Sequence, residues 1–122
     1  MIKLTFCLTR LPSLSRDAFQ AYWYESHAPL VKSVAEVLGI RRYVQMHSLP
    51  DEASAALQAS RGGLASYDGV AQLWYDSLED LGVRMADPKA REAAQLLLED
   101  EKKFIDLARS PLWWGVERPI IG

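Results

Sequence analysis

The chain has 122 residues, of which 49% are hydrophobic and 25% charged, and this is the composition of one globular domain spanning residues 1–122. Its net charge of −2 excludes the basic surface that binds nucleic acid or an anionic membrane. The single cysteine, Cys7, excludes an internal disulfide framework, and no stretch forms a signal peptide or approaches the ~20 apolar residues of a membrane span, so we expect a cytoplasmic protein.

The chain opens with the patterns of a strand and a long helix. Residues 2–9 alternate between apolar and polar side chains, which is the period of a half-buried strand. Ser15 is a suitable N-cap for the helix that follows, and Gly39 stands where a left-handed C-terminal cap is expected. The pattern therefore predicts a helix from Ser15 to about Leu38.

A weaker second strand and a long loop come next. Residues 40–47 can alternate across a sheet, and three of their side chains then share one face: Tyr43, Gln45 and His47. The segment 49–66 is rich in Ala, Ser and Gly and has no clear hydrophobic period. We expect a long loop there, with room for one helical turn near residues 53–59.

The second half contains a strand, two helices and a last strand. Residues 68–75 are typical of a strand, and Ser77 begins a short helix of the capping-box type. The pair Asp87-Pro88 ends that helix and begins another, with Asp as N-cap and Pro at the first helical position. We expect this helix to continue through Leu107 and residues 112–117 to form the fourth strand.

The order strand–helix–strand, strand–helix–helix–strand predicts an α+β fold. Two such halves form a ferredoxin-like, four-stranded antiparallel sheet with helices on one face. The other face is then uncovered, and we assign Tyr43, Gln45 and His47 to it. An uncovered face of mixed polarity usually meets a partner, and a second copy of the chain is the simplest one. We therefore expect a homodimer.

The most informative stretch is Phe19–Leu30, which contains three consecutive aromatic residues, a histidine and a proline. On a helical wheel His27 falls within the apolar arc, one turn after Trp23. A partly desolvated imidazole stays neutral near pH 7 and can act as a general base or hydrogen-bond donor. Pro29 removes the helical partner of the Glu25 carbonyl. We infer a small-molecule site here, with a satisfied, half-buried histidine beside a kink as the alternative.

Other candidates have both a functional and a structural interpretation. Tyr43 and His47 share a strand face, so they could line one cavity or belong to a dimer interface. Asp68 could contact a ligand or open its strand through a tight turn, and Trp74 could line a pocket or fill the core. No metal-ligand spacing, phosphate loop, dinucleotide fingerprint or nucleophile elbow is present, so we expect no metal and no cofactor.

Four segments carry a resemblance to a known family: Phe19-x-x-Tyr22-Trp23-x-x-x-His27-Ala28-Pro29-Leu30, Arg42-Tyr43-Val44-Gln45, Tyr67-Asp68-Gly69-Val70-Ala71-Gln72-Leu73-Trp74 and Asp100-Glu101-x-x-Phe104. With these segments the chain resembles the EthD-type proteins of the dimeric α+β barrel superfamily, over nearly its whole length except residues 50–66. The resemblance implies a homodimer in which two sheets pack face to face. It also implies a cavity between sheet and helices in each protomer, with His27 near it.

The resemblance further implies a role in small-molecule metabolism. EthD-type proteins are linked to the breakdown of ethers and other xenobiotics. Related members are cofactor-independent dehydratases, isomerases and monooxygenases that act on aromatic or polyketide-like compounds. In such an enzyme His27 would be the acid/base, Tyr43 and Tyr22 would orient the ligand, and the remaining contacts would come from Trp23, His47, Asp68, Trp74 and Phe104.

Two other functions stay open at this point. The chain could be a non-catalytic accessory protein that holds such a compound for a partner oxidase. It could also be a haem-binding barrel in which His27 is an axial ligand.

Overall fold

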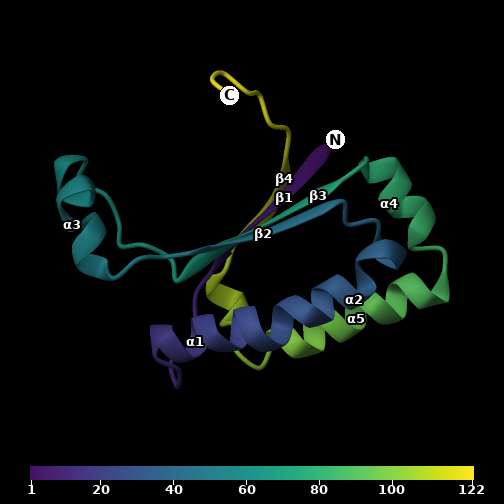
Figure 1. Ribbon diagram of the computed structural model, residues 1–122, viewed down its shortest axis with the longest axis horizontal. Coiled ribbons are helices and arrows are strands. Elements are labelled where there is room, and N and C mark those ends of the chain that lie inside the picture. The colour runs from purple at the N-terminus through teal and green to yellow at the C-terminus, as the bar shows by residue number, and fades with distance from the viewer.

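Four antiparallel strands form one sheet in the computed structural model, which describes residues 1–122 (Figure 1). The strands are β1 (Ile2–Leu8), β2 (Arg42–His47), β3 (Gly69–Tyr75) and β4 (Leu112–Gly115), in the order β2-β3-β1-β4. The central pair β1–β3 is in register from Ile2 opposite Tyr75 to Leu8 opposite Gly69. This topology confirms the predicted ferredoxin-like α+β fold.

The main helices lie together on one side of this sheet (Figure 1). They are α1 (Arg16–Tyr22), the π-helix η1 (Trp23–His27), α2 (Ala28–Leu38) and α5 (Pro88–Glu101), and α5 packs along α2. The expected caps of the first helical segment are present. The Ser15 hydroxyl accepts from the Ala18 N–H, and Gly39 adopts a left-handed φ of 75°. None of the helices is both long and apolar enough to cross a bilayer.

The predicted long helix is interrupted by one π-turn. The Ala28 N–H donates to the Trp23 carbonyl, five residues back, instead of four. Because Pro29 has no N–H and its ring clashes with the carbonyl one turn back, the regular α-helical pattern cannot pass this point, and a π-turn absorbs the extra residue. The Gln45 side chain donates to the same Trp23 carbonyl at 3.0 Å. This turn carries both Trp23 and His27 into the interior.

Strand alternation decides which side chains face the helices. Tyr43 pairs with Leu73, a core residue, and Tyr43 itself packs against the core. Gln45 reaches the Trp23 backbone and His47 stacks on the Trp23 ring, so they also face the helices. The assignment of Tyr43, Gln45 and His47 to the uncovered face is therefore wrong. β2 is an edge strand with apolar and polar residues on both faces, so its pattern did not distinguish them.

The predicted loop and the end of the last helix also differ from the structure. The expected loop at 49–66 contains a helix, α3 (Asp51–Ser60), which buries no residue and stands away from the other helices (Figure 1). Such a helix has no core face and hence no apolar period, although alanine favours helix formation. The last helix ends at Glu101, not Leu107, because residues 104 and 105 pair with the segment after β1.

Two short helices complete the chain. α4 (Leu78–Arg84) begins at Ser77, whose hydroxyl accepts from the Asp80 N–H as the capping box predicts. A single 3-10 turn, η2 (Leu107–Arg109), then leads into β4 beside β1. β4 ends at Gly115, two residues before the expected end.

Candidate active site

An apolar cavity of about 120 Å³ lies between the helix-facing side of the sheet and the helices. We call it the inner cavity. Most of its wall is hydrophobic, and four polar or titratable side chains interrupt that wall: His27, Tyr43, Tyr75 and Glu101. The hydrophobic part comes from β1, β3, η1, α2, α5 and the segments around β4: Leu4, Phe6, Leu8, Trp23, Val31, Ala71, Leu73, Leu97, Ile105 and Leu112.

His27 enters this cavity from the π-turn and is 5% exposed. Its Nδ1 lies 2.7 Å from Oδ2 of Asp100, which is also buried. The other oxygen of Asp100 accepts a hydrogen bond from the Tyr22 hydroxyl at 2.7 Å, and Lys103 Nζ lies 3.5 Å from it. The imidazole is therefore held by a carboxylate that is itself held by a phenol and an ammonium group.

The charge on Asp100 determines which nitrogen of His27 is available. Burial alone would raise the pKa of Asp100, but the hydrogen bonds from Tyr22 and His27 outweigh it and keep this pKa below its usual value. An ionised carboxylate only accepts hydrogen bonds, so Nδ1 of His27 must carry the proton. Nε2 of the neutral ring then has the lone pair. It has no hydrogen-bond partner, and no partnerless side-chain N or O atom is fully buried, so Nε2 retains some accessible surface on a residue that lines the inner cavity.

The same network sets the proton affinities of its members. Burial lowers the pKa of His27 below its ordinary value of 6.5, although the hydrogen bond and charge of Asp100 act in the opposite direction. The hydrogen bond to Asp100 is the main reason that the pKa of Tyr22 rises to about 12. At neutral pH the set therefore consists of a neutral imidazole, a carboxylate and a phenol.

Glu101 is the second acid/base group on the cavity wall. Burial, followed by the nearby charge of Asp100, raises the pKa of Glu101 to about 7. The carboxyl makes no hydrogen bond and no ion pair. Burial and the charge of Glu101 also raise the pKa of Tyr75 to about 12. Glu101 can thus be protonated near pH 7 while His27 is neutral, which is the combination that an acid–base pair requires.

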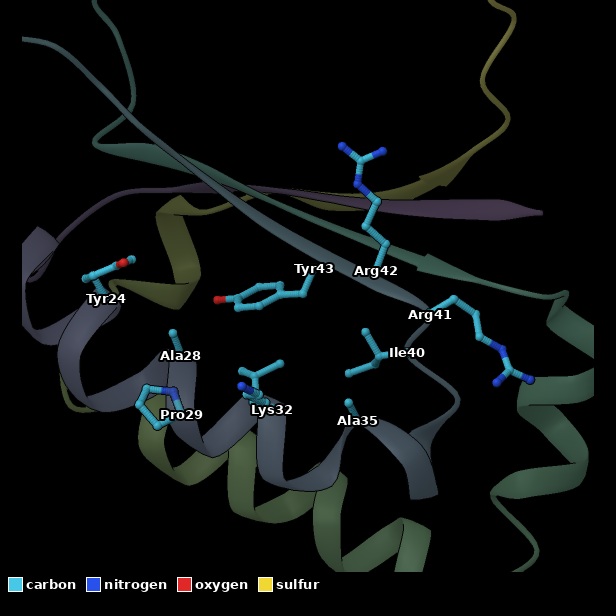
Figure 2. A pocket seen from close by; sticks show the side chains of 10 residues that line it. Tyr24, Ala28, Pro29, Lys32, Ala35, Ile40, Arg41, Arg42 and Tyr43 are labelled. Atoms are coloured by element: carbon cyan, nitrogen blue, oxygen red, sulfur yellow. The ribbon is translucent and has the colours of Figure 1, made fainter.

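A larger cleft, which we call the outer cleft, lies between β2 and α2. Figure 2 shows this outer cleft, which has a volume of about 600 Å³. The Tyr43 ring points into the space between β2 and α2, whereas Arg42 points to the other side of the strand (Figure 2). The cleft is lined by Tyr24, Ala28, Pro29, Val31, Lys32, Ala35, Ile40, Arg41, Arg42 and Tyr43. Val31 and Tyr43 also line the inner cavity, so they separate the two spaces.

The structure brings several of the predicted site residues together. His27, Trp23 and Tyr43 all line the inner cavity. Tyr22 is one step removed, because its hydroxyl binds Asp100 behind the imidazole. Phe104 is fully buried, with its ring centroid 5.0 Å from that of His27. It packs against the imidazole without lining the cavity.

The other three predicted residues lie elsewhere. His47 stacks on Trp23 with 4.5 Å between ring centroids and faces a separate hollow at the surface. Asp68 forms ion pairs with Arg10 and Arg16, which fix the start of β3. Trp74 alternates to the open face of the sheet and binds Glu117 there, so it does not wall the cavity.

The sequence alone assigns no role to three residues of this site: Asp100, Glu101 and Tyr75. Asp100 and Glu101 end a helix, where adjacent acidic residues are ordinarily solvated, and only the contact of α5 with η1 shows that they reach His27. The available signal was an acidic pair just before the buried Phe104. No group of three His, Cys, Asp or Glu side chains is arranged to hold a metal ion.

Comparison with known proteins matches this chain to one family and to fungal enzymes. The EthD domain family matches residues 11–108. A protein of Metarhizium robertsii named conidial pigment biosynthesis dehydratase EthD is 30% identical over 118 residues, covering 94% of this chain and 81% of that protein. A protein of Claviceps purpurea named decarboxylase is 30% identical over 117 residues, covering 92% of this chain and 79% of that protein.

Solved structures support the fold. An EthD family protein of Bacillus halodurans superimposes with a TM-score of 0.62 at 22% identity, covering 97% of this chain and 99% of that one. A dimeric protein of ferredoxin-like fold from Bacteroides fragilis superimposes with a TM-score of 0.58 at 8% identity, with 93% of each chain covered. SnoaB, a cofactor-independent oxygenase of Streptomyces nogalater, superimposes with a TM-score of 0.53 at 12% identity. The match covers 98% of this chain and 95% of SnoaB.

Proposed function

This chain belongs to the EthD domain family, and on that premise we propose that it is a cofactor-independent lyase that dehydrates a cyclic, polyketide-like hydroxyketone. The observation that carries the proposal is the pairing of His27 with Asp100 in a mostly apolar cavity that also holds Glu101. Two acid/base groups with oppositely shifted pKa values allow one to accept a proton while the other donates one. The name of the Metarhizium robertsii relative favours dehydration as the reaction.

The proposed reaction is a β-elimination. The lone pair on His27 Nε2 removes the proton from the carbon next to the ketone, and the C–H electrons form the C=C bond. The β-hydroxyl leaves with the proton of the Glu101 carboxyl as water. His27 then holds one extra proton and Glu101 lacks one, and transfer of a proton between them through solvent restores both groups. The apolar wall keeps other bases and water from the reacting carbon.

Asp100 has a positioning role in this scheme. It holds the Nδ1–H tautomer and stabilises the imidazolium that forms when Nε2 takes up the proton. Tyr22 in turn fixes the Asp100 carboxylate and does not reach the cavity. Tyr43, whose hydroxyl accepts from Gln45 at 2.8 Å, is the phenol placed to contact the substrate.

Decarboxylation is the second candidate, because the Claviceps purpurea relative is named a decarboxylase. A substrate carboxylate in the apolar inner cavity would lose its hydration, which favours departure of CO2. The proton needed at the remaining carbon would come from the neutral Glu101 carboxyl or from His27 in its imidazolium form. Neither fungal relative is named for ether chemistry, so ether breakdown is not part of this proposal.

The direct experiment uses a small hydroxyketone whose dehydration product is fluorescent. Loss of water from 3-hydroxy-1-tetralone gives 1-naphthol, whose fluorescence and mass are easily followed. We expect the purified protein to accelerate this reaction without added metal, flavin or haem. Binding of the ketone without any naphthol would favour the accessory-protein alternative instead. A Soret band after addition of haem would favour the haem-binding alternative.

We also propose that two copies associate through the open sheet face. This face exposes Met46 on β2, beside Val44 and Val70, and Trp113 on β4 at the opposite edge of the sheet. Large exposed apolar side chains on one face are a mark of interaction surfaces. The strands that supply these residues, β2, β3 and β4, carry the helices on the opposite side (Figure 1). A two-fold axis would bring this face against itself.

A further inference from the structure

Tyr75 is the one polar side chain on the wall of the inner cavity to which the proposed reaction gives no role. The residue is 8% exposed, and it follows Ala71 and Leu73 in the alternation that directs every second side chain of β3 toward the helices. Burial removes the hydrogen bonds that a hydroxyl group makes with water, so a buried tyrosine ordinarily pairs with another polar group of the protein. An unpaired one needs a physical explanation.

The hydroxyl of Tyr75 has no hydrogen-bond partner within the chain. Because no partnerless side-chain N or O atom is fully buried, this hydroxyl retains some accessible surface on a residue that lines the inner cavity. Burial, followed by the charge of Glu101, raises the pKa of Tyr75 to about 12. The phenol is therefore protonated at neutral pH, and it is a hydrogen-bond donor without an acceptor.

Packing holds the Tyr75 ring without using its hydroxyl. The ring meets that of Trp114 edge to face, with 5.3 Å between the two centroids. The other phenol on the cavity wall, Tyr43, already accepts a hydrogen bond from Gln45. Tyr75 thus combines a fixed ring with an unused donor, as electrostatic preorganisation requires.

We propose that the Tyr75 hydroxyl donates a hydrogen bond to the ketone oxygen of the substrate. In a β-hydroxyketone, the two oxygens are bonded to the carbons on either side of the carbon that loses its proton. Tyr75 and Glu101 lie close enough for the charge of Glu101 to act on the phenol. They can therefore bind the ketone and the hydroxyl respectively, while His27 faces the carbon between them.

This hydrogen bond becomes stronger as the elimination proceeds. When Nε2 of His27 removes the proton, the C–H electrons move into the new C=C bond and negative charge builds up on the ketone oxygen. A donor fixed in an apolar wall stabilises that charge more than it stabilises the neutral ketone, so it lowers the barrier. Tyr75 keeps its own proton, and Glu101 still supplies the proton that leaves with the hydroxyl as water. The catalytic role rests on the proposed function, whereas the hydrogen bond can be tested without it.

An unreactive ketone tests the hydrogen bond directly. 1-Tetralone has the ketone of 3-hydroxy-1-tetralone but no hydroxyl to lose, and a carbon-13 label at its carbonyl reports hydrogen bonding through the chemical shift. We expect the resonance of the bound ketone to lie downfield of its position in hexane. Tyr75→Phe keeps the ring and removes only the hydroxyl, and it should return this resonance by at least half of the difference.

Tyr67→Phe is the matched control, because it makes the same change in a tyrosine that does not line the inner cavity. It should leave the bound resonance unchanged. The turnover of 3-hydroxy-1-tetralone provides a second readout. Tyr75→Phe should lower kcat about a hundredfold, as loss of one oxyanion donor does, and change KM less than about threefold, while Tyr67→Phe keeps the wild-type rate.

The resonance and the rate separate this proposal from the proposed function. A downfield resonance that depends on Tyr75, in a protein that does not convert hydroxyketones, would support the donor and refute the lyase. Full turnover in Tyr75→Phe would overturn the donor and leave the lyase intact. The donor would also be overturned if 1-tetralone did not bind, or if its bound resonance responded to Tyr43→Phe but not to Tyr75→Phe.

Discussion

At His27, one hydrogen bond determines which nitrogen can react. The carboxylate of Asp100, itself held by Tyr22, accepts a hydrogen bond from Nδ1–H and leaves the lone pair on Nε2. Glu101 lies next to Asp100 in the chain but belongs to the cavity wall and has no partner. Two neighbouring carboxyl groups therefore have different proton affinities near pH 7, because Asp100 accepts two hydrogen bonds and pairs with Lys103, whereas Glu101 is desolvated.

Replacing Asp100 with Asn should change both the pKa and the tautomer of His27. Removal of the carboxylate removes the influence that raises the His27 pKa, so this pKa should fall further below 6.5. An amide NH₂ facing the ring also favours the Nε2–H tautomer, in which the cavity nitrogen has no lone pair. NMR titration of the ring resonances measures both effects, with His47→Gln used for assignment. An unchanged His27 pKa would contradict the pairing.

Replacing Glu101 with Gln should alter how stability depends on pH. The pKa of Glu101 is raised from 4.5 to about 7 in the folded state, so its favourable contribution is complete below pH 4.5 and is lost as the pH rises through 7. Gln does not ionise. Relative to the wild type, Glu101→Gln should gain on the order of 1–3 kcal/mol in unfolding free energy between pH 4.5 and pH 8.

Urea unfolding at pH 4.5 and pH 8 measures this difference. Glu99→Gln is the matched control, since Glu99 is on the same helix but forms an exposed pair with Lys102. Its relative stability should not increase with pH. A constant difference between wild type and Glu101→Gln at both pH values would show that Glu101 is not desolvated.

At the scale of elements, the π-turn and the start of β3 depend on each other. Gly69 lies against Trp23, and a Cβ atom at position 69 would overlap the Trp23 ring and come within 2.9 Å of the Met46 carbonyl oxygen. Glycine is needed there for a close approach rather than for an unusual φ angle. The contact fixes Trp23, and with it the wall of the inner cavity.

The change Gly69→Ala should therefore destabilise the protein by about 1–3 kcal/mol, as overpacking of a full core does. Gly82→Ala is the comparison, because no atom lies within 4 Å of the added Cβ in helix α4. That change should stabilise the protein by about 0.5–1 kcal/mol through the better helix propensity of alanine. Thermal or urea unfolding of the two variants measures whether the unfolding free energy falls in Gly69→Ala and rises in Gly82→Ala.

The elements also show what the sequence can predict. Caps at Ser15, Gly39, Ser77 and Asp87 and the period-two pattern of residues 2–9 depend on local chemistry, and the structure confirms them. Helix α3 and the orientation of β2 escaped prediction because neither has a clear apolar face.

The same limit applies to the site. The wheel position of His27 could be predicted because its neighbours on one helix are apolar. Its partner Asp100 is 73 residues away in sequence, and only the packing of α5 beside η1 brings the two together.

At the scale of the whole molecule, the two faces of the sheet differ in what they carry. The main helices lie on one side of the sheet (Figure 1), and the cavity with its acid/base groups is on that side. The other side presents the exposed apolar residues Met46 and Trp113 to solvent in the isolated chain. Association through the open side would leave each cavity within one protomer. Dimer formation and proton transfer can then be disturbed independently.

Light scattering should report a mass of two chains for the wild type. Met46→Glu places a charge on the open face, where Met46 is 51% exposed, and should shift the population to single chains. Leu64→Glu, at a position 92% exposed in a loop, should leave the dimer intact. A wild-type mass of one chain at micromolar concentration would contradict the proposed association.

The central claim is that Nε2 of His27 removes the proton in the elimination. The most direct measurement is the rate at which 3-hydroxy-1-tetralone forms 1-naphthol in wild type, His27→Gln and the control His47→Gln, with circular dichroism to confirm folding. We predict that His27→Gln loses at least about a hundredfold in kcat while His47→Gln keeps the wild-type rate. A folded His27→Gln protein that turns over at the wild-type rate, or a wild type that does not exceed the uncatalysed rate, would contradict it.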